Sequence, residues 1–359
     1  MITILYPYRN RELSRIKRSL DSLSEQSNKN FNVLFVDYGS KLELSESVKE
    51  LLSSYDFVKY IYSYHCNQPW SRAKAINIGL KQVETEYVFV ADIDMIFRVD
   101  FVEKLNQFKK PNNAIYFKVG FLDKKESKLE KLYFDYKVSY YSQPGAQGLS
   151  LFPIEMLKKV NGFDEFFHFW GAEDEDIHNR LKNAGYESVF YNDEILMLHQ
   201  WHASYRVSET KGLNQYLQLA NISRINQEHL YENEKSGCTI VNHNKWGRII
   251  SKAEFEFLDN GCSSIVIENR KEVVDYFLYV QLASHRKGVL NVVFQIDNFQ
   301  NSLKYVLKKV LGKTVPSYYT LKEINDVVLL QLISFYRDCN YSFVVSSDLK
   351  SLHLKIKKD

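Results

Sequence analysis

Hydrophobic and polar residues alternate with two different periods along the first two hundred residues of the chain. Short apolar runs at Ile2–Tyr6 and Tyr87–Ala91 have the length and the β-branched and aromatic content of buried strands. Between them, Leu13, Ile16 and Leu20 recur at helical spacing. The same criteria predict strands over residues 32–36, 58–64 and 114–121 and helices over 71–83, 100–109, 153–160 and 173–185. This alternation predicts a layered α/β domain.

The pattern changes around residues 233–244, where Gly, Asn, Ser and Lys replace the periodic apolar positions. Because this composition is typical of a segment between domains, we expect a large domain over residues 1–244 and a small α/β accessory domain over 245–359. In the second domain the pattern predicts strands over 264–268, 290–296 and 342–345 and helices over 271–284, 300–311 and 321–338. We expect the lysine-rich tail from His353 onward to be a solvated end.

Composition sets broad limits on the class of protein. Hydrophobic residues make up 45% and charged residues 25% of the 359 residues, which is ordinary for a soluble globular protein. The formal net charge of +3 is too small to indicate a nucleic acid partner. The four cysteines show neither disulfide-type nor metal-ligand spacing. Because the sequence shows no signal-peptide pattern and no apolar run of membrane-spanning length, we expect a cytoplasmic protein, with peripheral attachment to the inner membrane face left open.

The first candidate for chemistry is Asp92-Ile93-Asp94, which follows the clearest predicted strand. Carboxylates at positions i and i+2 project from the same side of an extended chain. In open α/β sheets, ligands bind outside the carboxyl ends of the strands. Two hard oxygen ligands there suit Mg²⁺ or Mn²⁺, which can bridge and neutralise a diphosphate. The alternative interpretation is an ordinary solvated loop.

The second candidate is the segment from Trp170 to Asp176, which contains four consecutive acidic residues after Gly171-Ala172. A helix N-terminus favours acidic residues through its dipole, and this accounts for one or two of them. Four beside a tryptophan indicate more, namely a general base next to an aromatic platform.

The third candidate is the pair His199 and His202, which ends an apolar run. A single histidine is usually structural. Two of them at i and i+3, after two carboxylate clusters, make a metal ligand plausible. The structural interpretation of His199, as a hydrogen-bonded strand end, stays open beside it.

Taken in order, these segments resemble glycosyltransferases of families 2 and 7 with the GT-A fold, in particular β-1,4-galactosyltransferases and the catalytic domains of bacterial chondroitin-type polymerases. The residues that carry the resemblance are Pro7–Arg11, Asp37, Arg72–Gly79, Val90–Asp94, Asn161–Phe163 and Trp170–Leu181. The resemblance covers about residues 1–210, and residues 245–359 have no counterpart in it.

The resemblance implies a role for each matched residue. The donor nucleotide-sugar would contact Pro7, Tyr8, Arg9, Arg11, Asp37, Arg72, Lys74, Asp92 and Asp94. The acceptor would contact Trp170, Gly171 and Glu173, with Asp174 as the catalytic base. The metal ion, Mn²⁺ or Mg²⁺, would be held by Asp94, His199 and His202.

The activity that the resemblance implies is inverting, metal-dependent transfer of a hexose or N-acetylhexosamine (galactose, GalNAc or GlcNAc). The donor would be a UDP-sugar, and the acceptor a glycan or lipid-linked glycan hydroxyl in bacterial surface polysaccharide synthesis. Two departures stand out: Ala172 replaces the second glycine of a Gly-Gly pair, and His199 takes the place of a methionine ligand.

Two other functions stay open at this point. One is a retaining enzyme similar to GalNAc-transferases, and the other is a catalytically silent glycan-binding or scaffold subunit. For the accessory domain over residues 245–359, we expect no catalytic role, but contact with a second copy of the chain or with a membrane surface.

Overall fold

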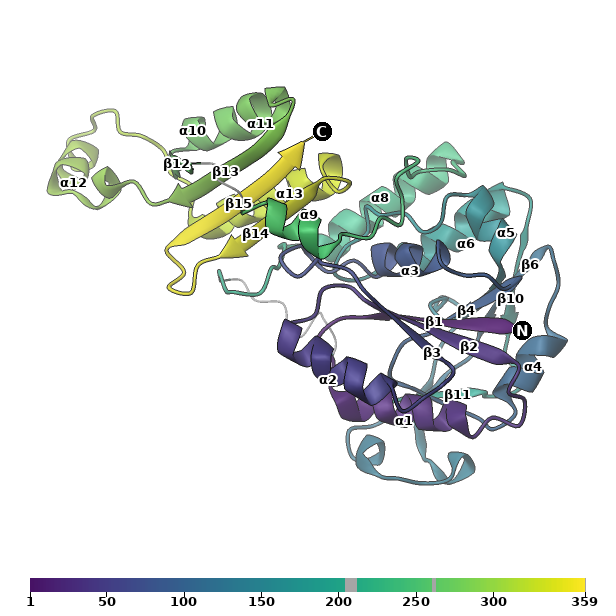
Figure 1. The fold of residues 1–359 in the computed structure, drawn as a ribbon. Helices are drawn as coiled ribbons and strands as arrows, with labels where there is room; N and C mark the ends of the chain where they lie inside the picture. Colours follow the sequence, from purple (N-terminus) through teal and green to yellow (C-terminus); the bar gives the residue numbers. More distant parts are fainter. Residues whose placement is uncertain (204–211, 260–262, 359) are drawn as a thin grey trace. The chain divides into compact units, whose positions relative to one another are not determined.

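The protein is represented by a computed structural model that describes residues 1–203, 212–259 and 263–358 (Figure 1). The chain divides into two compact units. The first consists of Met1–Cys66, Trp70–Val207 and Ile222–Ile249, and the second of Asn67–Pro69, Ser208–Asn221 and Ile250–Asp359. The boundary predicted after residue 244 therefore falls inside the last segment of the first unit, and the second unit takes two short segments from within the first.

The first unit is built on a mixed sheet of seven strands within its described residues. In spatial order these are β10 (Glu187–Tyr191), β6 (Asn113–Phe117), β9 (Ser150–Pro153), β4 (Tyr87–Val90), β1 (Ile2–Tyr8), β2 (Phe31–Asp37) and β3 (Val58–Tyr62). All pairs are parallel except those of β9 with its two neighbours. All seven residues of β1 are buried, because helices cover both faces of the sheet at its centre.

Helices lie on both faces of this sheet (Figure 1). On one face are α1 (Leu13–Ser24), α2 (Leu42–Leu52) and α4 (Phe101–Gln107), and on the other are α3 (Arg72–Leu80), α5 (Ile154–Lys159) and α6 (Glu173–Asn183), with α8 (Ile222–Ser236) beside α6. Each face has its own apolar core, and alternate residues of β1 enter the two cores. The predicted α/β layering is confirmed.

A smaller sheet of the first unit follows directly after the Asp-Ile-Asp segment. It contains β5 (Met95–Phe97), β11 (Met197–His199), β7 (Gly120–Leu122) and β8 (Val138–Tyr141), in this order, with short 3₁₀ turns at Glu126–Lys128 and Tyr133–Asp135 before β8. The apolar run predicted as one strand over 114–121 is two strands, one in each sheet.

The second unit contains a four-stranded sheet in its described part, in the order β12 (Ile265–Glu268), β13 (Gly288–Gln295), β15 (Ser351–Lys358) and β14 (Asn340–Val345). Its helices are α9 (Lys252–Phe257), α10 (Lys271–Tyr276), α11 (Leu282–Ser284), α12 (Leu303–Val310) and α13 (Leu321–Phe335), with a π-helical stretch at Phe277–Gln281 and a 3₁₀ turn at Asn298–Asn301. Among the described residues, no helix combines the length and the apolar character needed to cross a bilayer.

The expectation of a solvated tail is wrong. The segment forms β15, which is antiparallel to both β13 and β14 and lies between them. Leu352, Leu354 and Ile356 are fully buried on one face, and lysines alternate with them on the other. The period of two therefore describes a half-buried strand, which the high lysine content concealed.

Helix α3 connects the main sheet to the functional residues. Ser71 caps its N-terminus by accepting a hydrogen bond from the Lys74 amide, as the sequence predicts. At Gly79 the helix lies so close to β1 that an added Cβ would come 2.2 Å from Leu5 Cδ1. This close approach fixes the helix against the strand.

Gly79→Ala should therefore destabilise the protein by about 1–3 kcal/mol, because the methyl group overpacks a filled core. In an open helix the same change would be stabilising by up to about 1 kcal/mol. Chemical denaturation of Gly79→Ala in the wild-type and Leu5→Ala backgrounds tests this. The loss should largely disappear in the Leu5→Ala background, whereas an equal loss in both would contradict the contact.

Candidate active site

All three predicted metal ligands lie together where the small sheet begins. Asp94 directly precedes β5, and the antiparallel pairing of β5 with β11 sets His199 opposite Met95. The Nε2 atoms of His199 and His202 lie 3.5 Å and 3.4 Å from the two carboxylate oxygens of Asp94. The ligand atoms of all three lie within 4.8 Å of one another. The pairing of two short strands thus gathers residues that are far apart in the sequence.

This cluster fits a divalent cation. Asp94 is only 5% exposed, and its Oδ1 atom is buried with no hydrogen-bond partner among the described residues. A buried carboxylate oxygen without a partner is costly, and a bound cation would remove that cost. One carboxylate with two imidazoles is a mixed donor set, which suits Mn²⁺ better than Mg²⁺ because Mg²⁺ prefers oxygen ligands.

Backbone hydrogen bonds hold the segment that carries His202. The Gln200 amide donates to the Asp94 carbonyl over 2.9 Å. The Trp201 amide donates to the Ser127 hydroxyl over 2.7 Å. The amides of the two residues before His202 therefore fix the segment that brings its imidazole to Asp94.

Arg72, the first residue of α3, links the two carboxylate clusters. Its Nε donates to Asp92 Oδ1 over 3.0 Å and its Nη1 to Asp174 Oδ1 over 2.6 Å. The same Nη1 lies 3.8 Å from a Glu173 oxygen, and Nη2 donates to the Gly148 carbonyl over 2.8 Å. Burial opposes the charged form of Arg72, but the three carboxylates outweigh it and raise its pKa. The Asp-Ile-Asp segment and the start of α6 are thus joined through one guanidinium.

The two carboxyl groups at the start of α6 are less acidic than usual. Burial and the neighbouring Asp174 raise the pKa of Glu173 to about 7, against the opposing charge of Arg72. Burial also raises the pKa of Asp174, again opposed by Arg72 and reinforced by Asp92. A carboxyl group whose pKa is raised in this way can accept a proton near neutral pH, as a general base must.

The backbone before α6 adopts unusual conformations. Gly171 has φ 92° and Ala172 has φ 79°, and the left-handed region costs a residue with a Cβ roughly 1 kcal/mol. The buried Asn226 of α8 donates from Nδ2 to the carbonyls of His168, Trp170 and Gly171 at 3.0, 3.0 and 3.2 Å. These bonds hold the loop in its strained form.

Asp176, the last residue of the acidic run, is structural. It forms a wholly buried ion pair with Arg180, with Nε and Oδ2 2.7 Å apart. Arg180 also donates to the carbonyls of Gly162 over 2.8 Å and Val160 over 3.1 Å. The Gly162 carbonyl of the Asn-Gly-Phe segment at 161–163 therefore helps to anchor α6 through Arg180.

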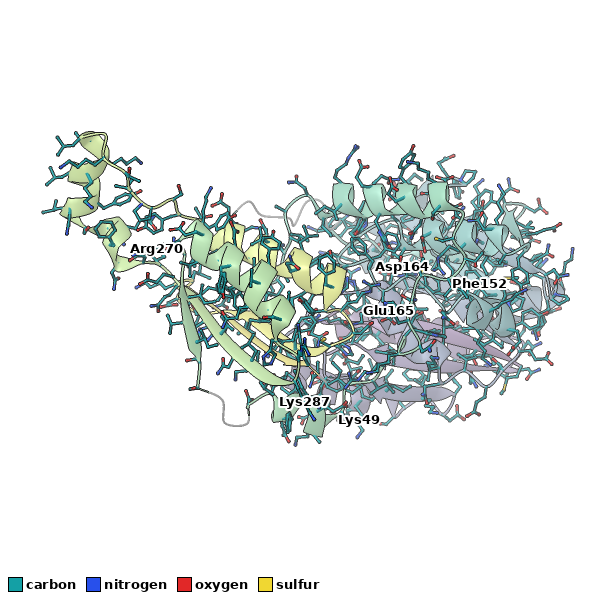
Figure 2. The ribbon with its side chains drawn as sticks, turned by 90° about the horizontal axis from the view of Figure 1, so that it is seen from above. Lys49, Phe152, Asp164, Glu165, Arg270 and Lys287 are labelled. Carbon is teal, nitrogen blue, oxygen red and sulfur yellow. The ribbon has the colours of Figure 1, made fainter. Side chains whose placement is uncertain are left out.

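A row of polar residues on α8 was not identified from the sequence. His229 lies 2.8 Å from Asp164, a residue labelled in Figure 2, and Asn233 donates to both Asp164 and Asp176, over 3.1 and 2.8 Å. Burial would raise the pKa of Asp164, but His229 and Arg180 bring it down to about 2. The spacing i, i+3 and i+7 of Asn226, His229 and Asn233 was the available signal, since it places three polar residues on one helix face.

Asp37, predicted to contact the nucleotide base, ends β2 and pairs in register with Tyr8 of β1. It is fully buried, and burial raises its pKa. Its Oδ1 accepts from the Ser40 amide over 2.8 Å and its Oδ2 from the Tyr60 hydroxyl over 3.0 Å. One oxygen thus holds the turn after β2, and the other joins the end of β2 to β3.

Arg9 follows the end of β1 and donates from Nη2 to the Cys66 carbonyl over 2.6 Å. Burial lowers the pKa of Arg9. Its guanidinium carbon lies 5.9 Å from the centre of the Tyr38 ring, and Tyr38 stacks on His65 at 4.1 Å. This aromatic pair beside Arg9 was not predicted.

The remaining predicted residues differ in exposure. Pro7 is buried in β1 and Lys74 in α3, whereas Arg11 is exposed. Trp170 is 41% exposed beside the carboxyl groups of α6, so its ring is accessible to a sugar. The predicted donor residues thus fall into two groups. Arg72, Asp92 and Asp94 lie in or beside the carboxylate and histidine clusters, whereas Pro7, Tyr8, Arg9 and Asp37 lie at the ends of β1 and β2.

Two family models match the first part of the chain. The glycosyl transferase family 2 model matches residues 3–151, and the model described as the N-terminal domain of galactosyltransferase matches residues 127–226. Together they span the sheet, the Asp-Ile-Asp segment, the acidic run and both histidines. The chain contains a glycosyltransferase domain over these residues.

Curated relatives of this glycosyltransferase domain are β-1,4-galactosyltransferases. The chain is 26% identical over 196 residues to β-1,4-galactosyltransferase 5 of Sus scrofa, which covers 49% of this chain and 46% of that protein. It is 30% identical over 132 residues to β-1,4-galactosyltransferase 6 of Homo sapiens, which covers 36% and 31%. The chain thus spans less than half the length of these relatives.

Solved structures similar to the chain include two further transferases. One is GalNAc-T7 with UDP, GalNAc and Mn²⁺, at 15% identity and a TM-score of 0.48, covering 64% of this chain and 47% of that one. The other is the mannosyltransferase PcManGT from Pyrobaculum calidifontis with GDP-Man and Mn²⁺, at 18% identity and a TM-score of 0.41, covering 55% and 56%.

The raised pKa of Glu173 predicts a pH-dependent stability of the glycosyltransferase domain. The folded state retains the proton to higher pH than the unfolded state, so stability is lost as pH rises from about 4.5 to about 7. Glu173→Gln removes this loss. Between pH 5 and pH 8, the unfolding free energy of the wild type should fall by roughly 1–3 kcal/mol more than that of Glu173→Gln.

Denaturant titrations at the two pH values measure this gain. Glu175→Gln is the matched control, because it removes an exposed carboxylate from the same helical turn. An equal pH response of the two variants would contradict the assignment to Glu173.

Proposed function

We propose that the protein is an inverting glycosyltransferase that moves galactose or an N-acetylhexosamine from a UDP-sugar to a glycan hydroxyl. The observation that supports it most is the single guanidinium of Arg72 between Asp92 and Asp174, next to the Asp94 cluster. In this proposal Asp174 is the general base on one side of the guanidinium, and Asp92, two residues before the cation ligand Asp94, is on the other. A direct displacement needs a base on one side and charge neutralisation at the leaving group on the other.

In the proposed reaction, the acceptor oxygen attacks the anomeric carbon of the donor sugar. Its proton passes to Asp174, and the bond to UDP breaks with both electrons leaving on the diphosphate. Arg72 holds Asp174 Oδ1 and so orients the carboxylate. Attack from the face opposite the diphosphate inverts the configuration at the anomeric carbon.

Asp94, His199 and His202 would hold the divalent ion in this proposal. A bound cation would supply positive charge to the diphosphate as negative charge develops on it. The mixed donor set supports Mn²⁺ as the preferred ion, with Mg²⁺ as the weaker alternative.

The galactosyltransferase relatives support the choice of a UDP-hexose donor. For the acceptor we propose a glycan or a lipid-linked glycan, and Trp170 supports this because an exposed indole can stack on a sugar ring. As the biological setting we propose surface polysaccharide synthesis in the bacterial cytoplasm, on the basis of the sequence resemblance to bacterial polymerase domains.

The donor and the metal can be tested together by measuring hydrolysis of UDP-, GDP- and CMP-sugars with Mn²⁺ and no acceptor. We expect slow hydrolysis of a UDP-hexose or UDP-N-acetylhexosamine and loss of this activity in excess EDTA. His202→Ala should raise the Mn²⁺ concentration needed for half-maximal rate by roughly tenfold or more, and more than His199→Ala does.

Turnover in excess EDTA equal to that with Mn²⁺ would refute the metal requirement. A larger effect of His199→Ala than of His202→Ala would reverse the assignment of the stronger ligand. Preference for a GDP- or CMP-sugar would refute the proposed donor.

The role of Asp174 predicts a separation of binding from turnover. Asp174→Asn keeps the shape and can still accept a hydrogen bond from Arg72, but it cannot take the acceptor proton. kcat for transfer should fall by roughly 10²–10⁴, while UDP and Mn²⁺ binding measured by calorimetry should persist. Glu175→Gln is the control for loss of a nearby carboxylate. A kcat for Asp174→Asn near that of wild type would refute its role as the base.

A further inference from the structure

Helix α12 of the second unit carries an apolar face that nothing covers within the described residues. None of its eight residues is buried. The aliphatic side chains at spacing i, i+3, i+4, i+7 and i+8 are between 51% and 82% exposed, and they are Leu303, Val306, Leu307, Val310 and Leu311. This is the spacing of one continuous stripe on a helix, and exposed stripes of this kind mark interaction sites.

The stripe points away from the rest of its unit. Tyr305 lies on the opposite side of the helix, about 160° from Leu303 and Leu307 at 100° per residue. Its ring packs edge-on against Phe299 and Tyr318, with ring centres 5.8 Å and 5.6 Å apart. Figure 1 shows α12 projecting from the end of the second unit. The tyrosine contacts therefore attach the helix by its back and leave the aliphatic stripe outward.

The charge around the stripe has one sign. Lys304 and Lys309 flank it on its two sides, and Lys308 and Lys313 add to the same region. The sequence from Asn298 to Lys322 contains no aspartate or glutamate. Long lysine side chains beside an apolar stripe can reach past it to anionic groups at the same surface.

We propose that α12 docks on an anionic phospholipid bilayer, with the aliphatic stripe at the acyl boundary and the lysines at the lipid phosphates. An amphipathic helix with aliphatic residues on one face and lysines around the other matches an interface of this kind. Negative lipid headgroups complement a segment whose charged side chains are all positive. The second unit thus holds the chain against a membrane surface.

A second copy of the chain fits this surface less well. Two α12 helices packed through their stripes would bring their lysines toward one another, with no acidic residue in the segment to balance them. The stripe also has only five aliphatic side chains, whereas a stable interface buries about 800 Å² on each partner. This inference does not depend on the proposed glycosyl transfer.

Flotation of the full chain with vesicles tests the proposal. The probes are vesicles of phosphatidylcholine alone and of phosphatidylcholine mixed with phosphatidylglycerol. We expect binding to the mixed vesicles, weakening with added salt, and little binding to phosphatidylcholine alone. Val310→Asp and Lys309→Glu should each lower the affinity for mixed vesicles by about tenfold or more.

Matched controls come from the same unit. Val266→Asp changes an exposed valine of β12, and Lys287→Glu changes an exposed lysine before β13; both should bind like wild type. Because Val310 and Lys309 are exposed, thermal unfolding followed by circular dichroism should not change.

Three results would overturn the proposal. The first is absence of vesicle binding, and the second is equal binding to both kinds of vesicle. The third is a change from dimer to monomer in Val310→Asp by light scattering, without an effect on vesicle binding, which would assign the stripe to pairing of two copies.

Discussion

The candidate site depends on one buried guanidinium. Three carboxyl groups lie around Arg72, at 2.6 Å for Asp174, 3.0 Å for Asp92 and 3.8 Å for Glu173. Without a cation among them, their mutual repulsion would be costly, because the side chains of Glu173 and Asp174 are only 12% and 29% exposed. A planar, permanently charged group with fixed donor directions can satisfy them at once, which a lysine cannot do. Arg72, the first residue of α3, thus allows the loop after β4 and the start of α6 to lie side by side.

The acidic run shows how helix geometry separates neighbouring residues into different roles. Glu173 and Asp174 face Arg72, whereas Asp176 turns inward to Arg180. Asn226 and the rest of the α8 row hold the loop on the other side. The loop before α6 is thus fixed by hydrogen bonds at both ends, and this compensates for the left-handed conformation of Ala172.

Local features of the fold were predictable and pairings were not. Five strands of the main sheet, the Ser71 cap and the carboxylates after β4 follow from period, composition and capping, which are properties of adjacent residues. The short strands β9 and β10 were not predicted. The alignment of Asp94 with His199 depends on two three-residue strands, which carry no periodic signal of their own. The hydrogen bonds that Asp37 accepts from Ser40 and Tyr60 likewise depend on how the chain folds around it. The same holds for the contacts of the polar residues on α8.

The position of β15 has a consequence for the order of folding in the second unit. In the described sheet β14 pairs with β15 and with no other strand, and β15 also pairs with β13 from Gly288–Lys358 to Gln295–Ser351. Residues 296–350 separate β13 from β15. The entropy of closing so long a connection is lost before the contacts form, which makes the pairing slow. Until β15 lies between them, β13 and β14 therefore keep unpaired strand edges that other chains and proteases can reach.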